Sequence, residues 1–391
     1  MFWKSAKDAI PGIVLFLLID KDKAMQVIGF DIHKTVNHCR KDWFIAAAFF
    51  LSCISTGALS QETDTIPGDI FEGTDILQIK IRANFDSLFA DAAASRIVTR
   101  DARIQYDSPD GRVWKDQIKI ETRGNFRMRP QNCSFPPLRI SFHQNDTLRQ
   151  LFRKNKTLKL VSQCQYQNSE YEQFLVQEYL IYKLYSLLTN YSFRVRLLKV
   201  TYVNQGSAFD TLVRYSFVVE SPQEMAKRLG CRRIFSTNVM HDKVDPGQYK
   251  LLCFFQYMVS NNDWSVAISH NIELLQKDST SSYIPVPYDF DWSGIIKVPY
   301  KVPSSRGMEI IQPDRTFKGE YTRRRQVRDM IRYFRSKQGE LYGRVSSCVV
   351  LDKQHKLLFL NGIREYYKIL NNIFYFRQGI IKHKPVVFIE E

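Results

Sequence analysis

Several patterns that identify a protein class at sight are absent from this chain. Its seven cysteines show no zinc-type Cys/His spacing, and the sequence has no internal repeat and no low-complexity block. Beyond residue 60 no apolar run is long enough to cross a bilayer, and no recognised nucleic-acid-binding module is present. These absences argue against a zinc-finger, repeat, membrane-spanning or nucleic-acid-binding protein.

The composition is that of a folded protein with a basic surface. Of the 391 residues, 44% are hydrophobic and 13% are aromatic, which is enough apolar material for one large or two medium domains. The formal net charge is +16, and such a field favours phosphate-bearing or otherwise anionic partners.

The N-terminal region has the order of a secretory signal peptide. Cations at Lys34, Arg40 and Lys41 precede an apolar run over 43–54, and small and polar residues follow through Ser60. We predict cleavage after Ser60, and hence an exported protein in the periplasm or outside the cell.

Two further expectations concern this region. The signal order begins well inside the chain, so we expect Met25 to be the true start and residues 1–24 to be an extension. Lipoprotein processing at Cys53 is the alternative to cleavage after Ser60. The predicted organisation is an extension and signal peptide over 1–60, a linker over 61–75, a β-rich lobe over 76–220 and a helical lobe over 221–391.

Export would place the remaining cysteines in an oxidising compartment, where disulfides persist. Cys133 and Cys164 flank two predicted strands that can lie side by side. We therefore predict an intramolecular Cys133–Cys164 disulfide.

The hydrophobic period changes once along the chain. Alternation and turn residues predict mostly antiparallel strands in the first half, and apolar residues at spacings of three and four predict a long helix from Glu170 to Leu188. The predicted strands cover 76–81, 102–106, 113–122, the end of 135–142, 157–161, 194–203 and 215–220. Helices are predicted over 246–259, 321–342 and 352–376.

Carboxylates and an amide gather around two short strands in the second half. Asp263 lies in a loop, Asn271 precedes a buried strand, and Asp289 and Asp291 follow the next strand. Asp and Asn oxygens are the hard ligands that Mg²⁺ takes, although the same residues also form ordinary turns. Their combination predicts a divalent-cation site.

The order of charged residues fits phosphoryl transfer. Lys159 is predicted on a strand and Glu178 on the following helix, before Asp263, Asn271 and Asp289. A kinase needs a lysine on the nucleotide phosphates held by a glutamate, an aspartate at the substrate hydroxyl, and an Asn and Asp on the metals. Alternatively, Lys159 is a strand-edge residue and Glu178 a helix-surface residue.

These motifs resemble those of the CotH (spore-coat) type of atypical secreted kinase. The chain is also similar to a group of uncharacterised exported proteins of Bacteroidetes-type bacteria that share VPYDFDWSG. The resemblance covers roughly residues 76–345. The motifs that carry it are Arg123-Gly124-Asn125, Leu158-Lys159, Asp263-Trp264, His270-Asn271 and Pro287-Tyr288-Asp289-Phe290-Asp291.

The resemblance implies an α+β, protein-kinase-like two-lobed fold, with an antiparallel β-rich N-terminal lobe and a mainly helical C-terminal lobe. It implies that ATP and Mg²⁺ or Mn²⁺ are the cofactors. Lys159, Glu178 and Arg123 would bind the nucleotide, and Asp263 would be catalytic with Lys159. Asn271, Asp289 and Asp291 would hold the metal.

Two features depart from the family pattern. No Gly-rich phosphate loop precedes Lys159, and eight residues separate Asp263 from Asn271. A basic helix from Arg323 onward is a solvated face, or else a surface for an acidic substrate or the anionic envelope.

Three functions follow as hypotheses. The first is an exported kinase acting on a protein or envelope hydroxyl. The second is a catalytically inactive binding or scaffolding protein of the cell envelope, and the third is a hydrolase that uses the carboxylates on another substrate.

Overall fold

The computed structural model describes residues 69–388 except 74, 109–110, 144–155, 279, 300–314, 322 and 387. All of these residues belong to one compact unit, residues 65–391. The predicted signal peptide, the Met25 start and the Cys53 processing site lie outside the described residues. The domain boundaries drawn from the sequence stay predictions.

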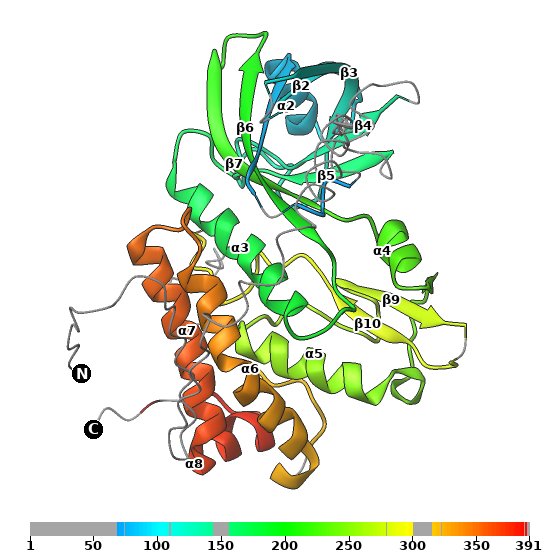
Figure 1. Ribbon diagram of the computed structural model, residues 1–391, viewed down its shortest axis with the longest axis vertical. Helices are drawn as coiled ribbons and strands as arrows, with labels where there is room; N and C mark the ends of the chain where they lie inside the picture. Colours follow the sequence, from blue (N-terminus) through cyan, green and yellow to red (C-terminus); the bar gives the residue numbers. More distant parts are fainter. Residues whose placement is uncertain are drawn as a thin grey trace, which may run out of the picture. The chain divides into compact units, whose positions relative to one another are not determined.

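Seven strands of the first half form a closed barrel in the order β1-β2-β3-β4-β5-β7-β6 (Figure 1). Alternate side chains point inward, so the barrel encloses its own apolar core, with Ile81, Ile118, Leu160 and Val200 fully buried. The strands are β1 (Leu77–Ala83), β2 (Arg100–Asp107), β3 (Val113–Thr122), β4 (Leu138–Phe142), β5 (Thr157–Val161), β6 (Val195–Asn204) and β7 (Thr211–Val219).

The barrel shows that the predicted protein-kinase-like two-lobed fold is wrong. A kinase-type N-terminal lobe has an open sheet, whereas here β1 pairs in parallel with β6, with Leu77 opposite Leu198, and closes the sheet on itself. The physical reason is that strand alternation specifies which face is buried but not which distant strand is the partner. The predicted strands are therefore present, in a different architecture.

The second half is mainly helical and contains a three-stranded sheet in the order β10-β9-β8. Helix α3 packs its buried face into the same apolar core as α5, α6 and α7. Helix α2 (Phe85–Ala93) instead follows β1 and buries Phe85 and Leu88 in the barrel core. The other elements are α3 (Glu170–Ser186), α4 (Pro222–Arg228), β8 (Cys231–Ile234), α5 (Pro246–Met258), β9 (Ile272–Lys277), β10 (Ile284–Pro287), α6 (Arg328–Ser346), α7 (Lys353–Asn371) and α8 (Ile373–Phe376).

A single residue explains where the predicted C-terminal helix divides. The helix predicted over 352–376 divides at Asn372, whose backbone is extended and whose side chain caps α8 by accepting from the Phe374 and Tyr375 N–H groups. Among the described residues, none of the helices is long and apolar enough to cross a membrane.

The predicted disulfide is confirmed. Cys133 and Cys164 are bonded, with their Cα atoms 4.7 Å apart, and the bond joins the β3–β4 connection to the residues after β5. Cys231, Cys253 and Cys348 are free.

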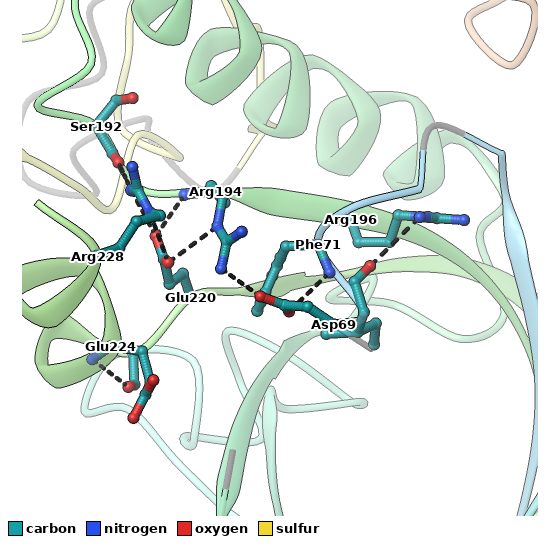
Figure 2. A network of polar contacts seen from close by, with 10 residues as sticks. Asp69, Phe71, Ser192, Arg194, Arg196, Glu220, Glu224 and Arg228 are labelled. Carbon is teal, nitrogen blue, oxygen red and sulfur yellow. Dashed lines mark hydrogen bonds and ion pairs between the residues drawn. The ribbon is translucent and has the colours of Figure 1, made fainter. Parts of the chain in front are cut away.

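An ion-pair network fixes the base of the barrel (Figure 2). Glu220, fully buried after β7, accepts from Arg194 Nε at 2.9 Å and from Arg228 Nη2 of α4 at 2.8 Å. Arg194 also donates to Asp69 Oδ2 at 2.6 Å. Two buried carboxylates, Glu220 and Asp69, thus tie together the strand ends at 194 and 220, helix α4 and the segment that enters the barrel, with Arg194 between them.

We expect the disulfide to contribute substantially to stability. The cysteines are 31 residues apart, and a cross-link of that span lowers the entropy of the unfolded chain by an amount worth roughly 3–4 kcal/mol. The double variant Cys133→Ser/Cys164→Ser should lose that much unfolding free energy in denaturant titrations. Cys231→Ser, at a free and half-buried cysteine, is the control, and an equal loss in both proteins would contradict the prediction.

Candidate functional site

The β9–β10 hairpin brings the predicted site residues to one place. Ile272 opens β9 opposite Pro287, which closes β10. The Tyr288 N–H donates to the Asn271 carbonyl at 3.1 Å and extends the pairing by one residue. Asn271 and Asp289 therefore lie at the same end of the hairpin.

Both residues occupy the left-handed region of backbone conformation. The φ angle is +53° at Asn271 and +60° at Asp289. Asn and Asp tolerate this conformation better than other non-glycine residues. The Asp289 N–H donates to the Tyr182 hydroxyl of α3 at 2.8 Å, which fixes Asp289 against that helix.

Three carboxylates converge at this point. Glu178 of α3, Asp289 and Asp291 each offer an oxygen, and these oxygens lie within 4.8 Å of one another. Glu178 and Asp291 are buried, whereas Asp289 reaches solvent. Three carboxylate oxygens at this separation, one of them open to water, fit a divalent cation that keeps some of its waters. The cluster can therefore hold a metal ion.

Arg127 is the internal counter-ion of the cluster. Its Nη2 lies 3.1 Å from Glu178 Oε2 and 2.6 Å from Asp291 Oδ2, and its Nε donates to Asp291 at 3.0 Å. The predicted Lys159–Glu178 ion pair does not form, because Arg127 takes Glu178. The Arg127 side chain is only 12% exposed, so these pairs are largely desolvated.

Burial sets the protonation of the acidic cluster. Desolvation raises the pKa of Glu178 to about 7, against the lowering effect of Arg127, and the charges of Asp291 and Asp289 add to the rise. The pKa of Asp289 is also raised, chiefly by desolvation and then by the charge of Asp291. The charges of Arg127 and Arg123 oppose that shift.

Two cations lie close enough to the cluster to interact with the charge of Asp289. Arg123 and Lys159 both feel the charge of Asp289, and desolvation lowers the pKa of each. Lys159 Nζ lies 5.9 Å from the centre of the Tyr288 ring. The Arg123 Nε atom is buried and has no hydrogen-bond partner, and neither cation forms an ion pair with a described residue.

Asp263 forms a separate polar unit with the residues before β9. Its Oδ1 lies 2.7 Å from His270 Nε2, and its Oδ2 accepts from Asn271 Nδ2 at 2.9 Å. The Asn271 amide nitrogen also donates to the Asp263 carbonyl at 2.8 Å. The Asn271 amide oxygen is left as the atom that can bind a ligand. Asp263 also raises the pKa of Asp289, so the two carboxylates share one field.

The structure thus groups the predicted residues in a different way from the sequence. Glu178 joins Asp289 and Asp291 instead of pairing with Lys159, and Asn271 contacts Asp263. Residues that the sequence interpretation missed are Arg127, Tyr182 and a role for His270. Two of them had a signal in the sequence: His270 belongs to the His270-Asn271 motif, and Tyr182 lies one helical turn after Glu178. No pattern distinguishes Arg127 from its neighbouring arginines.

Comparison with protein-family models found no match to this chain, and comparison with curated proteins found none either. The resemblance to the CotH type therefore depends on the short motifs alone.

Stability should depend on pH through Glu178. The folded state holds a proton near pH 7 that the unfolded state releases near 4.5, so unfolding free energy falls as pH rises between these values. In chelator-containing buffer, Glu178→Gln should flatten this part of the profile. Glu340→Gln, at an exposed carboxylate of α6, should keep the wild-type slope, and a Glu178→Gln profile parallel to wild type would refute the assignment.

Proposed function

We propose that this protein is an exported, metal-dependent phosphotransferase that moves a phosphoryl group from ATP to a hydroxyl of a protein or envelope component. The observation that carries the proposal is the pairing of an acidic cluster with two cations that lack ion-pair partners among the described residues. An acidic cluster alone suits a metal ion, and cations alone suit an anion. Both sets facing Asp289 suit a metal–polyphosphate complex.

Each residue has a part in this chemistry. A bound Mg²⁺ or Mn²⁺ would neutralise charge on the transferred phosphoryl group, with Asp289 and Asp291 as ligands beside Glu178. Arg123 and Lys159 would hold phosphate oxygens in a setting where burial strengthens their attraction.

Asp263 would accept the hydroxyl proton of the acceptor substrate. It is 39% exposed and so reachable by a substrate, and His270 and Asn271 fix its orientation. The activity does not require a kinase-type fold, because phosphoryl transfer depends chiefly on positioning and electrostatics.

Export is part of the same proposal. The disulfide is compatible with an oxidising compartment and the N-terminal signal order agrees with it. We propose that the chain is related to the CotH type through its site motifs and not through its fold.

One observation favours a second function, an inactive binding or scaffolding protein. Arg127 already pairs with Glu178 and Asp291, so two of the three carboxylates are satisfied without a metal. In that case the site would have a structural role, and the Arg127 guanidinium would take the place of a metal ion.

Ligand-induced stabilisation distinguishes the two functions. A ligand that binds only the folded state at 100 times its Kd adds about 2.7 kcal/mol of stability. We expect Mn²⁺ with ATP to raise the unfolding temperature of wild type, Asp289→Asn to abolish the rise, and Lys159→Met to abolish the ATP-dependent part while keeping the response to Mn²⁺ alone.

The matched control is Asp329→Asn, at an exposed carboxylate of α6, which should respond as wild type does. Release of ADP, lost in Asp289→Asn, would then report the chemistry. A rise of equal size in wild type and Asp289→Asn, or none in either, would move the assignment to the scaffolding protein.

A further inference from the structure

We infer that the outer wall of the barrel binds an acidic polysaccharide in a groove across β1, β2 and β3. The groove has a volume of about 440 Å³. It is lined by Lys80, Arg82, Arg103 and Lys115, together with Gln105, Gln117, Ile104 and Asp116.

Strand register places the four cations together. Arg82 lies directly opposite Arg103, and Lys80 and Lys115 lie on either side of Gln105. These residues alternate with the buried residues of their strands, so their side chains stand on the outer face. Asp116 shares the strand face of the buried Ile118 and so does not lie among them.

The placement of like charges opposite each other on β1 and β2 lowers stability, and a bound anion would offset that cost. Like charges directly opposite each other on neighbouring strands are destabilising. None of the four cations forms an ion pair with a described residue. An anionic partner would relieve the repulsion between Arg82 and Arg103 while binding.

The chemistry of the groove selects among polyanions. A closed barrel has no free strand edge, so an extended acidic peptide cannot add to the sheet by backbone pairing. None of the described residues that line the groove is aromatic, so they offer no ring on which nucleic-acid bases could stack. The apolar one among them, Ile104, is buried and offers nothing to insert into a membrane. The Gln117 amide beside the cations suits hydroxyl groups, and so does the Gln105 amide oxygen, whereas the Gln105 Nε2 already donates to Asp107 Oδ1 at 2.7 Å. A hydroxylated polymer with regularly spaced anionic groups meets all of these conditions.

The groove is independent of the candidate phosphotransfer site. Lys159 lies on β5, which is separated from β1, β2 and β3 by other strands around the barrel. The binding can therefore be present whether or not the proposed phosphotransferase activity is.

Heparin, a linear sulfated polysaccharide, is the probe. The full chain with Lys80→Gln, Arg82→Gln, Arg103→Gln and Lys115→Gln should bind it at least about tenfold more weakly than wild type, because four surface ion contacts are lost. Its unfolding temperature should equal or exceed that of wild type, since the repulsion between strands is removed.

The control removes the same charge elsewhere, with Lys227→Gln, Lys243→Gln, Lys353→Gln and Arg377→Gln at exposed positions outside β1, β2 and β3. This variant should bind heparin within about twofold of wild type. Salt screens charges that lie farther than a Debye length from the bound polymer, so their removal has little effect on its affinity. Equal losses in the two variants, or an unchanged groove variant, would overturn the proposal. Tighter wild-type binding to polyglutamate, single-stranded DNA or anionic vesicles than to heparin would also overturn it.

Discussion

The Arg127 guanidinium, held between Glu178 and Asp291, is the contact on which the candidate site depends. It joins three segments that are distant in sequence: the connection after β3, helix α3 and the turn after β10. Breaking such a largely buried pair by removing one partner typically costs 3–5 kcal/mol, because the remaining charge has no counter-ion. The same guanidinium is the counter-ion of two buried carboxyl groups and so lets the acidic cluster exist without a metal ion.

The balance of charge around Asp289 is the basis of the proposal that the site binds a ligand carrying both signs. Arg127 offsets part of the negative charge of the triad, while Arg123 and Lys159 add positive charge that interacts with Asp289. The carboxylates attract a metal ion and the two cations attract a phosphate group, so each should bind more strongly when the other is present. A metal–polyphosphate complex satisfies both sets, and its burial beside desolvated groups strengthens each contact.

Local structure could be predicted from the sequence more fully than its long-range pairing. The strands 113–122 and 157–161 have the bounds that alternation and turn residues indicate. The parallel β1–β6 pairing that closes the barrel has no local signal, and the short strand β8 lacks the alternation that would reveal it. In the site, residues at the ends of β9 and β10 could be located because strand ends fix their position. The choice of Arg127 over Lys159 as the partner of Glu178 depends on how the β3–β4 connection folds back over α3, and residue spacing does not encode that.

The most direct test of the central claim is a crystal structure with Mn²⁺ and a non-hydrolysable ATP analogue, with the metal located by its anomalous scattering. We expect a manganese peak in contact with Asp289 and Asp291, and phosphate oxygens within hydrogen-bonding distance of Arg123 and Lys159. The contrary result is a site at saturating Mn²⁺ with no anomalous peak and with Arg127 still bound to both Glu178 and Asp291. That outcome would show that the acidic cluster is a structural ion-pair network.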